Sequence, residues 1–122
     1  MFVSFTINQD LQLVKVKFEQ KVTSQDVKSY LQQLRNDPRF NTNYSELVDL
    51  TTVNESDINF KMASDLARSA DPFSHNARRA FAAPNAAVFG TTRMYQMIRQ
   101  DEENMRCFHT MEQAKTWLGI SD

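Results

Sequence analysis

The chain has 122 residues, of which 41% are hydrophobic and 24% charged, as in an ordinary globular domain with one core. Its 14 basic and 15 acidic residues are spread along the sequence, so we expect no nucleic-acid partner. A single cysteine, no apolar run long enough to span a membrane and no signal-peptide pattern at the start together predict a cytoplasmic protein without internal disulfides.

The first part of the sequence predicts a β-hairpin followed by a helix. Apolar and polar residues alternate over 3–7, as in a strand with one buried face, and residues 11–18 form a second strand after a short turn. The apolar positions change phase within this second strand, so we expect a bulge or a strong twist near Leu13. Thr23 is a good N-cap for a helix that ends before Pro38.

The rest of the sequence alternates between strands and helices. The expected strands lie at 44–50, 78–84 and 105–109, and the expected helices at 58–70, from Asn85 to about Glu103, and at 110–119. The order is therefore β-β-α-β-α-β-α-β-α. Helices between successive strands imply parallel strands with right-handed crossovers, so we predict an α/β fold that begins with one antiparallel hairpin.

Four strings carry a resemblance to a known family across nearly the whole chain. They are "VTSQDVKSYLQQL", "YSELVDLTTV", "FGTTRMYQMI" and "CFHTMEQAKTWL". In this order the chain resembles the SpoIIAA-like proteins, relatives of the STAS domain (sulfate transporter and anti-sigma factor antagonist). The resemblance implies a single domain over 1–122 with a singly wound β-α superhelix. Its sheet would be mostly parallel with one antiparallel N-terminal strand, and its helices would lie mainly on one face.

The resemblance also implies a motif after the strand at 44–50. In STAS anti-sigma antagonists this strand ends in Asp-Leu-Ser-x-Val, and Asp-Ser-Ser-Gly then begins the next helix, with its first serine phosphorylated. Here residues 49–53 and Asp57 match, whereas Ile58, Asn59 and Phe60 replace the two serines and the glycine. The phosphoacceptor is missing, so we expect no phosphoserine switch of this kind.

The first functional hypothesis is a non-enzymatic protein-interaction or regulatory module that docks an unknown protein partner. Loops at the carboxyl ends of parallel strands are where α/β folds place ligands. The candidate docking residues are Asp49, Thr51, Thr52, Asn54, Ser56 and Asp57. The alternative for the same residues is that they cap the following helix and satisfy the turn. Whether Ser56, Thr51 or Thr52 is phosphorylated stays open.

The second hypothesis is a small apolar-ligand or lipid-binding protein with a pocket between sheet and helices. Similar one-sided β-α superhelices occur in CRAL-TRIO-type lipid-transfer proteins, which is an analogy at the level of the fold. The candidate pocket residues are Phe89, Met94, Tyr95 and Trp117, although such a stripe is also typical of a core. A sheet face that is less covered by helices could instead support a homodimer.

The sequence predicts no metal, no cofactor and no catalytic site. Cys107 and His109 lie two apart on a predicted strand and share a face, but no third ligand or orienting group is near in sequence. Several basic residues near 78–84 could form an anion site or remain solvated charges. They are Arg68, His75, Arg78 and Arg79.

Overall fold

The computed structural model describes residues 3–100 and 103–121, and it is built on a five-stranded sheet. The strands run in the order β1-β2-β4-β6-β7, with β1 and β2 antiparallel and the other neighbours parallel. Their bounds are Val3–Asn8 (β1), Leu13–Phe18 (β2), Ser45–Asp49 (β4), Arg79–Ala82 (β6) and Met105–Phe108 (β7). The predicted hairpin and parallel strands are thereby confirmed. A small second sheet, which the sequence did not predict, pairs β3 (Lys21–Val22) with β5 (Glu55–Ser56).

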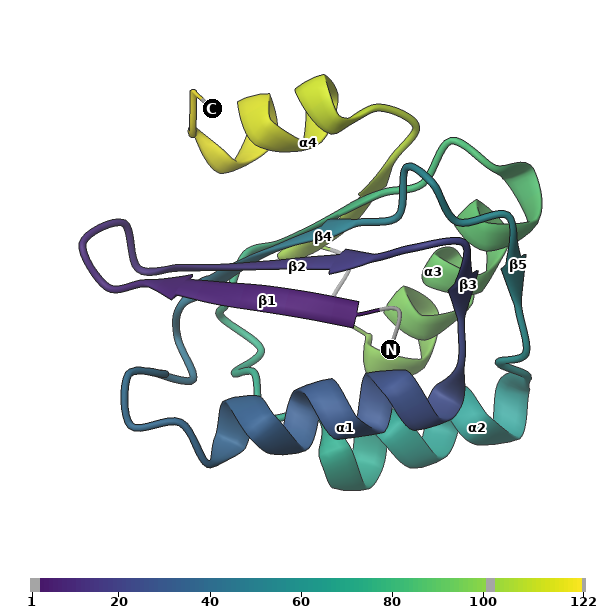
Figure 1. The fold of residues 1–122 in the computed structure, drawn as a ribbon, viewed down its shortest axis with the longest axis horizontal. Helices are drawn as coiled ribbons and strands as arrows, with labels where there is room; N and C mark the ends of the chain where they lie inside the picture. Colours follow the sequence, from purple (N-terminus) through teal and green to yellow (C-terminus); the bar gives the residue numbers. More distant parts are fainter. Residues whose placement is uncertain (1–2, 101–102, 122) are drawn as a thin grey trace.

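The helices lie mainly on one face of the sheet, as predicted (Figure 1). α1 (Ser24–Arg35), α2 (Phe60–Asp65) and α3 (Ala86–Arg99) lie on one side, and α2 continues into a π-helical turn, η1 (Leu66–Ala70). The last helix, α4 (Met111–Leu118), crosses the opposite face. Within the described residues, none of the helices is long and apolar enough to cross a membrane.

Local capping signals fix where the helices begin. Thr23, Asn85 and Thr110 each accept a hydrogen bond from a backbone N–H in the first turn of the helix that follows. At its other end α3 is shorter than predicted. It stops at Arg99, because Gln100 adopts the left-handed conformation with φ 59°, rather than continuing to about Glu103.

Of the two alternatives expected near Leu13, a bulge or a strong twist, the bulge is wrong. The β1–β2 register runs without interruption from the pair Val3 and Phe18 to the pair Asn8 and Leu13. Leu13 and Val14 are both fully buried, because the start of β2 is covered on each face, and Leu11 lies in the exposed turn. The change of phase in the sequence reflects burial on both faces of one regular strand.

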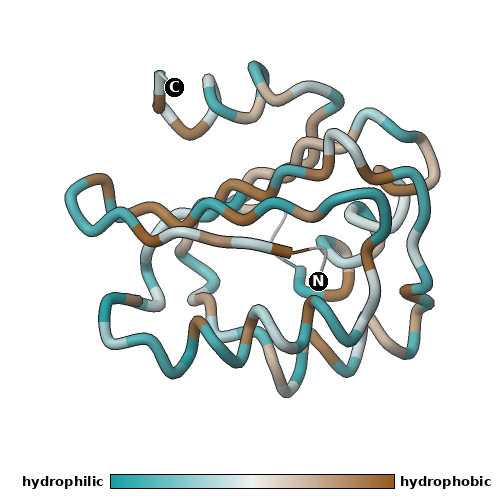
Figure 2. Tube along the Cα trace, viewed as in Figure 1, coloured by the Kyte–Doolittle hydropathy of each residue, from teal (hydrophilic) through white to brown (hydrophobic). Residues whose placement is uncertain are grey.

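Two apolar clusters follow from helices on both faces. The larger lies between the sheet and α1, η1 and α3, and contains Val14, Val16 and Phe18 from β2. The smaller lies under α4, where Leu13, Leu47 and the small residues of β6 meet the apolar side of the helix. In Figure 2 the hydrophobic positions run along the strands between these layers. The site described below lies within the larger cluster and at its edge.

Candidate functional site

The predicted docking loop is held by its own hydrogen bonds. Asp49 ends β4, and its Oδ1 accepts from the backbone N–H of Thr51 at 2.9 Å and from the Thr51 hydroxyl at 2.6 Å. The backbone N–H of Asn54 donates to the carbonyl of Gln20 at 3.0 Å, which ties the loop to the end of β2. These bonds give the loop one defined conformation at the carboxyl edge of the sheet.

Asp57 caps a different helix from the one the sequence suggested. Its Oδ1 accepts from the backbone N–H of Ser24 at 3.0 Å, so its carboxylate lies at the start of α1. The cap of α2 is Asn59, whose side chain accepts from the N–H of Met62. Ser56 lies in β5, and its hydroxyl accepts from the N–H of Ile58. The capping hydrogen bonds expected of this loop are present, but Asp57 caps α1 and Asn59 caps α2.

The loop nevertheless presents an exposed surface. Thr51, Thr52, Asn54 and Asp57 are exposed, while Val53 between them is buried and anchors the loop in the core. Immediately after the loop, Phe60 is 66% exposed, although large apolar side chains are generally buried. The segment 51–60 therefore combines a fixed backbone, several polar side chains and one exposed aromatic ring.

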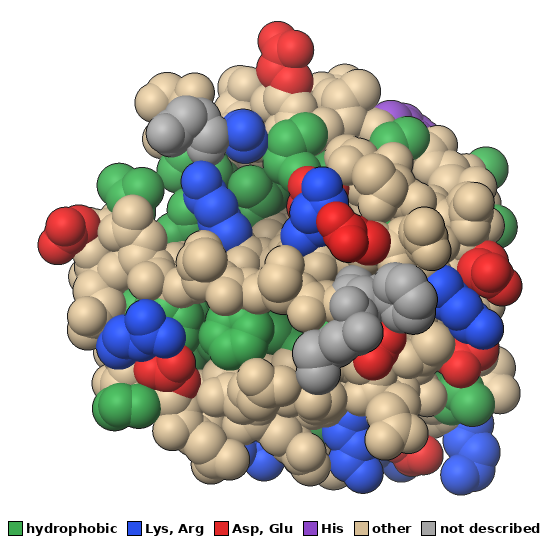
Figure 3. Space-filling model, in the orientation of Figure 1, with side chains coloured by type: hydrophobic (Ala, Val, Ile, Leu, Met, Phe, Trp, Pro, Cys, Tyr) green, Lys and Arg blue, Asp and Glu red, His purple; other side chains and the backbone are tan. Residues whose placement is uncertain are grey.

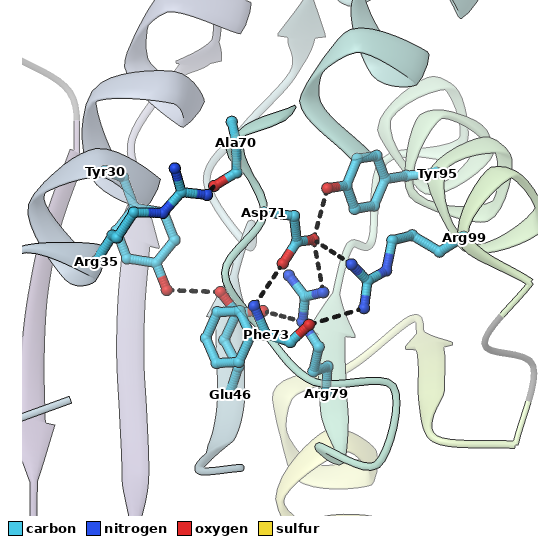
Figure 4. Close-up of polar contacts among 9 residues, drawn as sticks. All are labelled: Tyr30, Arg35, Glu46, Ala70, Asp71, Phe73, Arg79, Tyr95 and Arg99. Carbon is cyan, nitrogen blue, oxygen red and sulfur yellow. Dashed lines mark hydrogen bonds and ion pairs between the residues drawn. The ribbon is translucent and has the colours of Figure 1, made fainter. Parts of the chain in front are cut away.

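Toward the amino ends of β4 and β6, a buried ion-pair network joins the sheet to its helices (Figure 4). At its centre Arg79, on β6, donates from Nε to Glu46 Oε1 at 2.8 Å and from one terminal nitrogen to Asp71 Oδ2 at 2.7 Å. The Arg79 guanidinium also lies 4.3 Å from the ring centre of Phe73. Arg99, on α3, is 3.6 Å from Asp71, so two guanidiniums balance two carboxylates. A charge-balanced cluster of this kind is how proteins accommodate ions away from water.

Two tyrosines reach into the network from opposite helices. The hydroxyl of Tyr30, on α1, donates to Glu46 Oε2 at 2.5 Å, and the hydroxyl of Tyr95, on α3, donates to Asp71 Oδ2 at 2.6 Å. The network thus connects α1, β4, β6, α3 and the segment after η1 by directional bonds. Directional bonds fix spacing and orientation in a way that apolar contacts do not.

The environment of the network sets the pKa values of its members. Burial alone would raise the pKa of Asp71, but attraction to Arg79 and Arg99 outweighs it and holds that pKa below its usual value. Burial, followed by the nearby Glu46 carboxylate, raises the pKa of Tyr30 well above its usual value. Burial and the Asp71 carboxylate do the same for Tyr95. The tyrosines therefore stay protonated and act as donors to the carboxylates.

An apolar cavity of about 80 Å³ lies between the sheet and α1, η1 and α3, with part of the network in its wall. Glu46 and Arg79 line it from the sheet, and Tyr30 and Tyr95 line it from the helices. Most of the remaining wall is apolar. Ile58, from the docking loop, is only partly buried and lies in the wall as well, which places the cavity beside segment 51–60.

The four residues predicted to border an apolar pocket do not share one. Tyr95 lines the cavity, but Trp117 packs in the smaller cluster on the opposite face of the sheet. Phe89 stacks on the ring of His109 at 4.2 Å between ring centres, and Met94 is partly exposed on α3. The prediction placed these side chains on one face because it could not know that α4 crosses to the other side.

The structure also places the other residues considered for chemistry. Burial raises the pKa of the Cys107 thiol, and His109 stacks on Phe89. Within the described residues, no group of three or more His, Cys, Asp and Glu side chains is placed to hold a metal ion. The basic residues near β6 do not gather as an anion site either. Arg79 is buried with its carboxylates, while Arg78 lies over the Trp117 ring at 4.1 Å on the other face.

Sequence reasoning missed Glu46 and treated Arg79 as a possible surface charge. A signal for both exists, because each is a charged residue immediately before the apolar residues of a short strand. A carboxylate buried within such a strand needs a cation near it. The register supplies one, since Glu46 on β4 lies directly beside Arg79 on β6. The pairing becomes visible only when the two strands are known to be neighbours.

We expect Arg79→Met to destabilise the protein by about 3–5 kcal/mol, because it leaves two buried carboxylates with one cation between them. Urea unfolding followed by circular dichroism measures the change. The matched control is Asp37→Asn, which breaks the exposed Asp37–Arg39 pair and should change stability little. Equal unfolding midpoints for Arg79→Met and the unmodified protein would contradict a stabilising role for the network.

The lowered pKa of Asp71 predicts acid sensitivity. A carboxylate whose pKa is lower in the folded state contributes its full stability above the unfolded value of about 3.9, and loses it as pH falls through the folded pKa. The stability difference between the unmodified protein and Asp71→Asn should therefore be largest at neutral pH and shrink in acid. Asp65→Asn, at an exposed site, serves as the control. A difference that does not change with pH would rule out this contribution.

Comparisons with known proteins give no further guide. No protein-family model matches the chain, and neither a curated protein nor a solved structure is significantly similar to it. The α/β fold with its mixed five-stranded sheet is therefore known from the structure itself, and every statement on function rests on the geometry of the chain's own residues.

Proposed function

We propose that the chain is a non-enzymatic interaction module of STAS-like type, similar to the SpoIIAA-like proteins. Its docking surface is segment 51–60, together with the end of β4 at Asp49. The observation that carries this proposal is the fixed conformation of an exposed loop that ends in an exposed aromatic residue, Phe60. Preordered surfaces with an aromatic anchor lose little entropy on binding and are typical of protein-protein contacts.

The residues at the family's serine positions support a module without the phosphoserine switch. Ile58 is partly buried and lines the apolar cavity, and Asn59 caps α2 through its side chain. Both positions serve the fold, and neither side chain can accept a phosphate as serine does. Any regulation through this loop would therefore operate by a different route from that of the anti-sigma antagonists.

The state of Cys107 supports a non-enzymatic role. A nucleophilic cysteine needs a lowered pKa and a base within hydrogen-bond reach. Here burial raises the pKa of Cys107, and Thr92 is its hydrogen-bonding neighbour. The buried network is likewise built of tyrosines and carboxylates that already satisfy one another.

We expect Phe60→Ser and Thr52→Lys to abolish capture of a protein partner by the tagged chain from extracts of its own organism. Both side chains are exposed, so the fold should be unaffected while the docking surface loses its anchor or gains a charge. Met97→Ser is the matched control, because Met97 is 59% exposed but lies on α3 away from the loop. A partner that binds all three variants equally would disprove docking through segment 51–60.

The second candidate function, binding of a small apolar ligand, is favoured by the cavity. Its wall is apolar apart from the network, and it lies between sheet and helices, where ligand pockets commonly form. At about 80 Å³ it is smaller than an engineered apolar cavity of about 150 Å³ that binds benzene or xenon. It would therefore take a single small group, and a lipid chain would need the cavity to widen.

The part of the cavity wall that bears on widening of the cavity is η1. Leu66 is the first residue of η1, and it forms part of the wall. π-Helical turns are rare and occur frequently at functional sites. A shift of η1 that enlarged the cavity would have to break the bonds of Asp71 to Arg79 and Tyr95, because Asp71 follows η1 directly.

Xenon provides a direct probe of the cavity. We expect xenon under pressure to shift the NMR signals of Val88, Leu66 and Phe81, which line it. Val88→Ile should weaken xenon binding and stabilise the protein by about 0.8 kcal/mol, because one more methylene fills space inside. Val53→Ile is the control: Val53 is buried but lies outside the cavity wall, so added volume there should destabilise. Unchanged xenon binding in Val88→Ile would exclude this cavity as the site.

A further inference from the structure

A second concave region lies on the opposite face of the sheet, where α4 leaves β1 and the part of β2 after Leu13 uncovered. α4 packs on β4, β6 and β7, and a groove of about 330 Å³ remains between it and the outer strands. Figure 3 shows hydrophobic side chains between α4 and the β1 edge, with Lys or Arg side chains lying over them. This groove is separate from the apolar cavity, which lies on the other face of the sheet, and it meets the proposed docking surface at Asp49.

The strand register explains why cations gather there. Lys15 and Lys17 lie two apart on β2, so both point away from the larger cluster, which holds Val16 between them. Across the hairpin Thr6 pairs with Lys15 and Ser4 pairs with Lys17, which places a hydroxyl beside each lysine.

The charge of the groove is positive on balance. Lys115, on α4, completes its rim opposite the two β2 lysines, and Asp49 is its acidic residue. Among the described residues that line the groove, Lys17 and Lys115 bring two positive charges against the one carboxylate of Asp49, which already accepts two hydrogen bonds from Thr51. The floor includes the apolar side chains of Leu47 and Met111. The groove therefore offers ammonium groups and hydroxyls at its rim and an apolar surface beneath them.

These features select one occupant. A second copy of the chain is disfavoured, because a two-fold contact through this face would bring lysines from both copies together. We propose that the groove binds a small amphipathic anion, a molecule with a phosphate or carboxylate group on an apolar body. Its volume lies within the range of about 300–1,000 Å³ found for small-molecule sites. The lysines would bind the anion by charge-assisted hydrogen bonds, and the floor would cover the apolar part.

The test uses phenyl phosphate and benzoate, which share a ring and differ in the anion, in NMR titrations of the whole chain. We expect at least one of them to bind at millimolar concentration and to shift the amide signals of Ser4, Lys17 and Lys115. Inorganic phosphate has the anionic group without the ring, and phenol has the ring without the anionic group. Each should bind at least roughly tenfold more weakly. The stronger of the two anions identifies the group that the lysines prefer.

The double variant Lys17→Gln, Lys115→Gln should weaken this binding roughly tenfold or more, while retaining the spectrum of a folded protein. Lys28→Gln, Lys61→Gln is the matched control, since it removes the same charge from exposed positions on the helical face. Equal loss in both pairs, shifts spread over all lysines, or no binding by either anion would overturn the proposal. So would sedimentation showing a dimer that the groove variant dissociates, because the occupant would then be a second copy.

Discussion

The ion pairs of Arg79 with Glu46 and Asp71 are the constraint on which the rest of the structure depends. Arg79 is 3% exposed and lies in the sheet. Because water cannot solvate its guanidinium there, protein carboxylates must neutralise the charge. Glu46 supplies one carboxylate from the neighbouring strand, and Asp71 supplies a second carboxylate from the end of η1. The free energy needed to desolvate these ions offsets much of the free energy gained from their attraction. Their distinct contribution is positional, since only one arrangement of β4, β6 and the helices satisfies every member.

This constraint also accounts for the cavity beside the network. An apolar void in a protein core tends to shrink as neighbouring elements relax into it. Here Tyr30 from α1 and Tyr95 from α3 each end in a short hydrogen bond to a fixed carboxylate, so the two helices cannot approach further without breaking those bonds. The tyrosines act as spacers, and the apolar wall above them is left incompletely filled. The same bonds that order the core therefore preserve a space within it.

The elements that could be predicted from sequence are those set by local chemistry, and the others depend on which segments become neighbours. Thr23 and Asn85 mark helix starts because a cap needs only its own turn. Asp57 carries an equally good capping side chain, yet it caps α1 from across the small sheet of β3 and β5, which no local pattern reveals. The burial of Glu46 is likewise decided by the pairing of β4 with β6. The loop proposed for docking follows a strand, as the sequence indicates, whereas the network, the cavity and the groove depend on the tertiary arrangement.

Asp49 connects surfaces that otherwise lie apart. Its side chain belongs to the groove on the α4 face, and its carboxylate holds Thr51 at the start of the docking loop. In the parallel register Asp49 lies directly beside Lys17, so the charge state of the groove acts on the residue that orders the loop. Asp49 therefore lies where the proposed groove and the proposed docking loop meet, at the end of β4.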